Sequence, residues 1–256
     1  MSARARMGRR SALLGLAGLG LASHSPAFGQ AGAFSVRILL TGGKKLGTPR
    51  DSGPARWAFE LVRRTSAPAR LGSASVSADD PKLLTEPFAL WTGAGEIPPL
   101  SRPEQRGLER FLKLGGVLVV DDQDPQRGTF GLAARRELAR VLPASPPVKL
   151  DASHVLYKSY YIIDRPVGRV LGPKALDAIV RGKSAQVVFL AHDLLGALAR
   201  SRGGAWSLPV EPGGPRQREY AVRLAVNIAM YSLCSDYKDD QVHAPFLMRR
   251  RAGRGP

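Results

Sequence analysis

Pro87-Phe88-Ala89-Leu90-Trp91 and Val117-Leu118-Val119-Val120 are two apolar runs that decide the fold. Each has the length and the continuous apolar character of a strand that is buried on both faces. Between the runs, Ser101 and Glu104 have the spacing of a helix capping box, and Leu108, Phe111 and Leu112 form one apolar helix face. Gly115-Gly116 ends this helix. The order strand, helix, strand predicts two parallel strands joined by a crossover helix.

The same alternation of strands and helices continues on both sides of this unit. Strands are expected at Phe34–Leu40 and Ala74–Val76, and a hairpin is expected at Ala175–Arg181 and Ala185–Leu190. Helices are expected at Ala55–Arg64, Arg135–Leu142 and Gln217–Cys234, the last with an apolar face at Ala221, Leu224, Ala225, Ile228 and Tyr231. We therefore predict a single α/β domain over residues 34–235, with a mostly parallel sheet covered by helices.

The first 33 residues have the order of a secretory signal peptide. Four arginines without any acidic residue precede a short apolar run at Ala12–Ala22, and Ser25-Pro26 and small residues follow it. The run is shorter than the roughly 20 residues that span a bilayer. We predict export to the periplasm, with cleavage after Ala31 or Ala33 and no stable transmembrane anchor. Arg9-Arg10 fits the twin-arginine route; an ordinary signal and a retained anchor are the alternatives.

The net charge of +17 has two interpretations. Removal of the predicted signal, which holds four arginines, would leave a charge of about +13. Such a charge suits a polyanionic partner such as nucleic acid, anionic lipid or an acidic cell-wall polymer. The basic residues are scattered among Ala, Gly and Pro, which the codon usage of a GC-rich genome also explains. Export argues against nucleic acid. The basic stretch at 236–256 is expected to be a disordered tail.

Cys234 is the only cysteine of the chain. One thiol cannot form an intrachain disulfide, and no cysteine follows the apolar run of the signal to carry a lipid. Because Cys234 falls within the last helix pattern, we expect a buried structural thiol.

Polar side chains that follow the predicted strands are the candidate site residues. Ligands of open parallel sheets bind beyond the carboxyl ends of the strands. Candidates for binding at these ends are Thr92, Gly93, Gly95 and Glu96. Candidates for acid–base chemistry are Asp121, Asp122, His154, His192 and Asp193.

A structural interpretation competes with each catalytic candidate. A carboxylate after a buried strand often caps the next helix or accepts hydrogen bonds from loop amides, and His192-Asp193 could cap the turn into Leu194. The sequence contains no His-Glu-x-x-His motif, no phosphate loop with its lysine and no Gly-x-Ser-x-Gly elbow. No cofactor is expected, although a metal held by His154 and His192 stays open.

From Phe34 to Ser235 the chain resembles a bacterial family known as domain of unknown function 4159. The residues that carry the resemblance are the glycine-ended strand at 87–95, Gly115-Gly116, Asp121-Asp122, Arg136-Glu137, Val141-Leu142-Pro143, His154-Val155, Ser159-Tyr160, His192-Asp193-Leu194, Val226-Asn227 and Tyr231. Ser159 and Tyr160 therefore join the binding candidates. The resemblance implies a flavodoxin-like three-layer sandwich, similar to class I glutamine amidotransferases. It also implies frequent export or membrane tethering, and genes near MoxR-type ATPases and von Willebrand A-like proteins.

The resemblance supplies no catalytic residues. Where class I amidotransferases carry a cysteine nucleophile, this chain has Asp121-Asp122-Gln123, which excludes thiolate chemistry at that position. The glycine turn has Ala94 where the family often has histidine, which weakens any metal role of that turn.

Two functions follow as hypotheses. The first is a non-catalytic envelope protein that binds a partner or a cell-wall ligand at the strand-end cleft, with a regulatory role in a secreted complex as a variant. The second is a hydrolase-like or metal-dependent enzyme that uses Asp121 or Asp122 with His154 and His192. The enzyme requires these side chains to converge on one concave surface.

Overall fold

A computed structural model describes residues 33–42 and 46–252, with side chains described as far as Cys234. In this part of the chain, seven strands form one sheet in the order β2-β1-β3-β4-β7-β6-β5. The parallel strands are β1 (Arg37–Leu40), β2 (Ala74–Ser77), β3 (Phe88–Gly93), β4 (Val117–Asp122) and β7 (Ser184–Leu190). Antiparallel to β7, β6 (Asp177–Arg181) pairs with it and carries the edge strand β5 (Val148–Lys149). The predicted α/β class and the mostly parallel sheet are confirmed.

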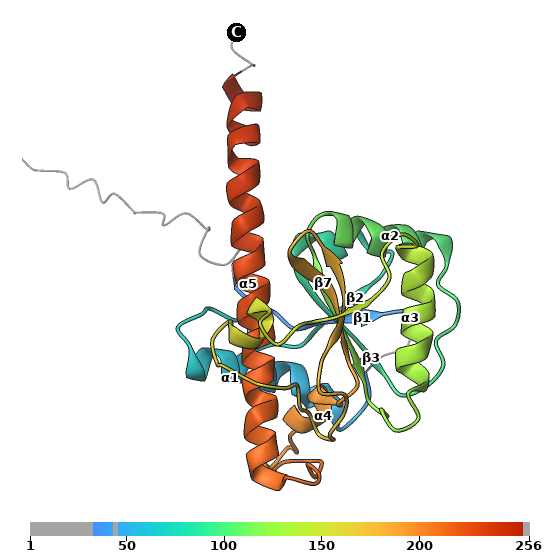
Figure 1. Cartoon of the computed structure of the whole chain (residues 1–256), viewed down its shortest axis with the longest axis vertical. Helices are drawn as coiled ribbons and strands as arrows, with labels where there is room; N and C mark the ends of the chain where they lie inside the picture. Colours follow the sequence, from blue (N-terminus) through green and yellow to red (C-terminus); the bar gives the residue numbers. More distant parts are fainter. Residues whose placement is uncertain (1–32, 43–45, 253–256) are drawn as a thin grey trace, which may run out of the picture. The chain divides into compact units, whose positions relative to one another are not determined.

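Helices cover both faces of the sheet (Figure 1). One face carries α1 (Gly53–Arg64), the short α4 (Leu194–Leu198) and the long α5 (Gly214–Ala252), and the other carries α2 (Arg102–Lys113) and α3 (Thr129–Val141). Three 3₁₀ turns lie in the connections, η2 (Arg50–Ser52), η3 (Pro81–Thr85) and η4 (Val155–Lys158). The described residues belong to one compact unit, Gly32–Pro256.

Alternation along the central strands divides the core into two apolar layers. Leu90, Val119 and Val188 pack in the layer of α1, α4 and α5, whereas Ala89, Leu118 and Val187 pack in the layer of α2 and α3. In the first layer, Trp57 of α1 is fully buried and its indole Nε1 donates to the carbonyl oxygen of Ala225 in α5 at 2.8 Å. Because both faces of these central strands are buried, their sequences are continuous apolar runs.

The predicted unit of strand, helix and strand between Pro87 and Val120 forms in the structure as β3, α2 and β4. Ser101 Oγ accepts from the Glu104 amide while the Glu104 carboxylate accepts from the Ser101 amide, so the capping box starts α2. The strands on either side pair in parallel from Phe88 and Val117 to Gly93 and Asp122. Thr92 and Asp121 therefore lie side by side at the carboxyl edge of the sheet.

Several predicted boundaries are wrong. In the structure α3 begins at Thr129, before the expected Arg135, and α5 continues to Ala252 instead of ending near Cys234. The tail expected to be disordered over 236–256 is therefore helical as far as Ala252. This stretch has no helical apolar periodicity and contains Pro245, so no pattern in it predicts a helix. The predicted signal at 1–33 lies almost wholly outside the described residues.

The expected burial of Cys234 is also wrong, because this thiol is exposed. At 100° per residue, Cys234 lies on the same side of α5 as Arg223, and away from the buried Leu224 and Ile228. Within the described residues, no helix combines the length and the apolar character needed to cross a membrane.

Candidate functional site

A cavity of about 220 Å³ opens at the carboxyl ends of β1 and β3. From β1 the chain passes to β2 at one edge of the sheet, whereas β3 leads to β4 and β7 on the other side. This change of direction makes β1 and β3 the topological switch point, where open α/β sheets bind ligands. The side chains and backbone around the opening include Thr41, Trp91, Thr92, Gly93, Gly95, Glu96, Gln123 and Phe130.

Hydroxyl and amide groups give this switch-point cavity its polar character. The Gln123 side-chain amide donates to Thr92 Oγ1 at 3.1 Å, and the Trp91 indole donates to Thr41 Oγ1 at 3.1 Å. A Cβ on Gly93 would lie 2.6 Å from the Phe130 ring, so glycine is required there to keep the strand against α3. The predicted binding residues Thr92, Gly93, Gly95 and Glu96 all line the cavity.

Among the described lining residues, Glu96 alone is charged. Its carboxylate is exposed and lies 3.3 Å from the Arg136 guanidinium. An exposed pair of this kind is weak and open to solvent. The cavity therefore offers neutral hydrogen-bonding groups and an indole wall, with a single carboxylate at its rim.

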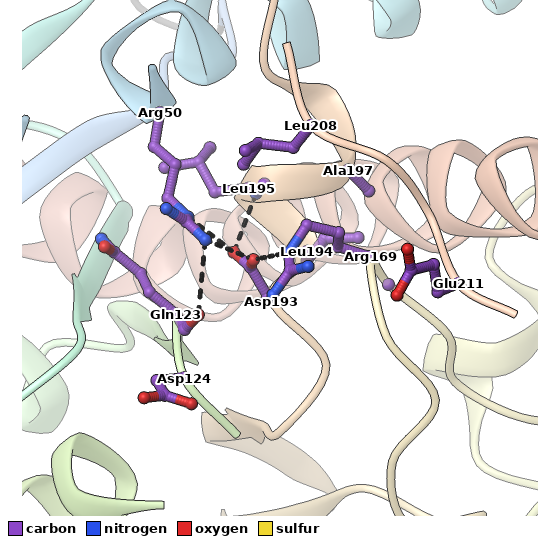
Figure 2. Close-up of polar contacts among 12 residues, drawn as sticks. Arg50, Gln123, Asp124, Arg169, Asp193, Leu194, Leu195, Ala197, Leu208 and Glu211 are labelled. Atoms are coloured by element: carbon purple, nitrogen blue, oxygen red, sulfur yellow. Dashed lines mark hydrogen bonds and ion pairs between the residues drawn. The ribbon is translucent and has the colours of Figure 1, made fainter. Parts of the chain in front are cut away.

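Next to the cavity, Asp193 organises a buried ionic cluster (Figure 2). Its carboxylate is inaccessible to solvent, and Arg50 binds both oxygens, with Nε 2.9 Å from Oδ1 and one terminal nitrogen 2.6 Å from Oδ2. Arg169 donates to Oδ2 as well, and the Gly196 amide of α4 donates to Oδ1 at 3.0 Å. Arg50 also reaches the carbonyl oxygen of Gln123 at 3.4 Å, which links the cluster to the cavity wall.

Asp121 and Asp122 serve the neighbouring turns. Both oxygens of the fully buried Asp121 accept hydrogen bonds, from the amides of Leu194 at 2.9 Å and Leu195 at 2.8 Å. Burial, together with the nearby Asp193 carboxylate, raises the pKa of Asp121 to about 8. Asp122 accepts from the amides of Asp124 and Gly131, each at 2.9 Å, and burial raises its pKa. The structural interpretation of these carboxylates therefore accounts for all their contacts.

The two candidate histidines do not meet. His192 follows the end of β7, where its buried Nε2 lies 3.1 Å from the carbonyl oxygen of Pro173 and donates to it. His154 caps η4 through Nδ1, and its ring lies 5.8 Å from that of Tyr231, whose hydroxyl accepts from Ala185 at the start of β7. The histidines thus lie toward opposite ends of β7.

The structure therefore does not bring Asp121 or Asp122 together with both histidines, and it places His154 and His192 too far apart to share one metal ion. Zinc binds imidazole nitrogens at about 2.0–2.1 Å, which a separation along most of a strand does not allow. In the ranges 33–42 and 46–234, no three His, Cys, Asp or Glu side chains gather in a way that could hold a metal ion.

Ser159 and Tyr160 also lie away from the cavity. Ser159 Oγ donates to the carbonyl oxygen of Val155 at 2.9 Å. The amides of Tyr160 and Tyr161 donate to Asn227 Oδ1 of α5 at 3.2 and 2.7 Å, and the Tyr160 hydroxyl donates to the carbonyl oxygen of Arg64. Tyr160 thus fastens the irregular segment to α5 and α1, whereas Ser159 bonds only within that segment.

Comparison with protein-family models places the chain in a family. The model described as "Domain of unknown function (DUF4159)" matches residues 38–233, which include the whole sheet except Arg37, the switch-point cavity and the Asp193 cluster. The chain belongs to the DUF4159 family. A comparison with curated proteins finds no match for this DUF4159 chain.

Sequence reasoning missed three residues of this DUF4159 site: Thr41, Arg50 and Arg169. Thr41 directly follows the predicted first strand, so the strand-end rule that selected Thr92 would have found it. Arg50 and Arg169 have no such signal, because Arg50 lies 143 positions from Asp193 and neither arginine belongs to a predicted strand end.

His192 gives the DUF4159 domain a stability that depends on pH. Burial lowers the pKa of His192 from 6.5 to about 4, so the folded protein keeps the imidazole neutral where the unfolded chain binds a proton. The contribution of His192 to the free energy of unfolding is therefore expected to fall as the pH drops from 6.5 toward 4, against the opposite contribution of Asp121. His192→Gln, which keeps an amide donor for Pro173, should flatten this part of the profile in urea denaturation. An unchanged slope would contradict the assignment.

Proposed function

We propose that this DUF4159 chain is an exported, non-catalytic binding domain that holds an envelope partner or a cell-wall ligand at the switch-point cavity. The carrying observation is the position and the lining of this cavity: Thr41, Thr92 and Gln123 offer neutral polar groups beside the Trp91 indole. Pockets for drug-sized ligands hold roughly 300–1,000 Å³. A cavity of about 220 Å³ suits the terminal group of a larger ligand, such as one sugar or amino-acid unit of a polymer.

The contacts of the neighbouring aspartate carboxylates support a binding function over a catalytic one. A general base must reach the proton that it removes, with a free lone pair at hydrogen-bond distance. Asp121, Asp122 and Asp193 bind backbone amides or arginines, and none of the three lines the cavity where a substrate would lie. Glu96 at the rim is the one carboxylate among the described lining residues, and it faces solvent.

The strand order supports a flavodoxin-like fold, which we propose as the finer description. The parallel strands follow the order β2-β1-β3-β4-β7, equivalent to the 2-1-3-4-5 order of flavodoxin-like sheets. We further propose a relationship to class I glutamine amidotransferases in which Asp121-Asp122-Gln123 replaces the nucleophile segment and its turn.

The partners and the location belong to the same proposal. The resemblance to families encoded near MoxR-type ATPases and von Willebrand A-like proteins supports a partner from such a system. The signal-like order of residues 1–33 supports export, and Arg9-Arg10 supports the twin-arginine route. Cell fractionation tests this part, because full-length protein confined to the cytoplasm would refute export.

A binding measurement tests the cavity directly. The probe is a soluble peptidoglycan fragment, N-acetylglucosaminyl-N-acetylmuramyl peptide, titrated into the full-length protein by calorimetry. Its hydroxyl and amide groups match those of Thr92 and Gln123. We expect Thr92→Val, which keeps the side-chain shape but removes the hydroxyl, to weaken binding about tenfold. The bound fragment should be recovered without cleavage.

Ser159→Ala is the matched control, because Ser159 loses a hydroxyl outside the cavity. It should bind like the wild-type protein. Equal affinities of the wild-type protein and Thr92→Val would remove the cavity from the proposal, and hydrolysis of the fragment would overturn the non-catalytic assignment.

A further inference from the structure

A second groove, of about 770 Å³, lies between α1, the start of α5 and the loop that precedes α5. It is separate from the switch-point cavity, and no residue lines both. Five arginines contribute to its lining, Arg56, Arg63, Arg64, Arg200 and Arg218, against two acids, Glu60 and Glu219. The groove is therefore basic.

Trp206 is the centre of this arginine groove. Guanidinium groups lie 3.4 Å from the centroid of its ring (Arg200), 4.3 Å (Arg218) and 5.3 Å (Arg56). The indole attracts each cation, but three cations around one ring repel one another. Burial, and after it the charge of the nearby Arg56, lowers the pKa of Arg200, a direction that agrees with this repulsion. An anion in the groove would relieve it.

The arginines differ in the donors that they leave free. Arg64 pairs with Glu219 at 2.7 Å and with Glu60 at 2.8 Å, and Arg218 donates to the carbonyl oxygens of Ala197 and Leu208. Arg56 also pairs with Glu60, and Arg200 donates to the carbonyl oxygen of Gly204, but Nε of each is buried and has no hydrogen-bond partner. These two buried donors belong to arginines that lie beside the exposed rings of Phe59 and Trp206.

Apolar side chains form the rest of the groove. Phe59 is 41% exposed and lies 4.7 Å from the Arg56 guanidinium, and Trp206 is 37% exposed. Pro209, Val210 and Val222 complete the lining. Tryptophan and arginine are enriched in the central contacts of protein interfaces.

We propose that this groove binds an acidic segment of a partner protein. One or two carboxylates of the segment would pair with Arg56 and Arg200, and an aromatic or aliphatic side chain would pack on Phe59 and Trp206. A densely charged polymer such as polyphosphate fits less well. Apolar side chains form part of its wall, and Glu60 carries a buried carboxylate within it.

The test uses the full-length protein and a fluorescein-labelled synthetic peptide of glutamate with interspersed phenylalanine and leucine. Anisotropy measures affinity, and iodide quenching reports Trp206, because Trp57 and Trp91 are buried. We expect the peptide to protect Trp206 from iodide. Arg56→Gln and Arg200→Gln should each weaken binding about tenfold, as expected for a charge-assisted hydrogen bond.

Arg127→Gln is the matched control, because Arg127 is 81% exposed and lies outside the groove. It should change the affinity less than twofold. Phe59→Ser removes the apolar contact with the peptide but leaves the ion pairs in place, and it should also weaken binding. This variant tests the proposal even if an arginine variant fails to fold. The proposal is overturned if the peptide does not bind, or if Arg200→Gln and Phe59→Ser both bind it as tightly as the wild-type protein does. Tighter binding of polyphosphate than of the peptide would also overturn it.

Discussion

Replacement of Asp193 by alanine is expected to lower the free energy of unfolding by about 3–5 kcal/mol. The substitution leaves the guanidinium groups of Arg50 and Arg169 without their carboxylate in a site where Asp193 is fully buried. It also removes the cap of α4 and places alanine at φ 50°, a left-handed conformation that costs roughly 1–2 kcal/mol. Urea denaturation followed by circular dichroism measures the loss.

Two further variants separate the causes. Asp193→Asn keeps a cap oxygen and a residue that tolerates the left-handed region, so its loss should be smaller and should report the missing charge. Glu96→Gln breaks the exposed pair with Arg136, and should change stability by about 0.5 kcal/mol or less. A similar, small effect for Asp193→Ala and Glu96→Gln would show that the buried cluster does not hold the fold.

Gly107→Ala is expected to destabilise the protein by about 3 kcal/mol, near the upper end for overpacking. Gly107 lies inside α2, where alanine would normally favour the helix by roughly 1 kcal/mol. A Cβ at this position would lie 1.9 Å from the backbone carbonyl oxygen of Ala78, just after β2. Since backbone cannot move aside like a flexible side chain, α2 or the β2 end must shift. Thermal unfolding should show a lower Tm.

Gly95→Ala provides the matched control for this prediction. No heavy atom lies within 4 Å of a Cβ at Gly95, and its φ is not in the left-handed region. We expect a change within about 0.5 kcal/mol, the usual range for surface substitutions. If Gly107→Ala were as stable as Gly95→Ala, the close approach of α2 to Ala78 would be disproved.

The parts of the fold that were predictable depend on local patterns. The apolar run at Val117–Val120, the Ser101–Glu104 capping box and the hairpin across Gly182-Lys183 are each specified within a few neighbouring residues. Their order along the chain then favours a parallel sheet. The same reasoning found Thr92 and Gly93, because a strand end is visible in the sequence.

The parts that were missed depend on distant pairings. Nothing near Asp193 in the sequence indicates that Arg50 would bind its carboxylate. His154 and His192 were predicted to act together because histidine suits both acid–base chemistry and metal binding. Their positions relative to β7, however, follow from the tertiary fold. The end of α5 was missed because the residues after Cys234 show no apolar periodicity and include Pro245, which normally ends a helix.

The packing of α5 has a consequence for the order of events in the cell. The Trp57 indole donates to the Ala225 carbonyl, and Asn227 holds the backbone of Tyr160 and Tyr161, so the layer of α1, α4 and α5 is incomplete without α5. A nascent chain that lacks this segment exposes an apolar layer, including Leu61 and Val188, on the ribosome. This apolar layer can therefore be completed only once α5 has been synthesised, so a chain shortened before α5 is expected to expose it to other proteins.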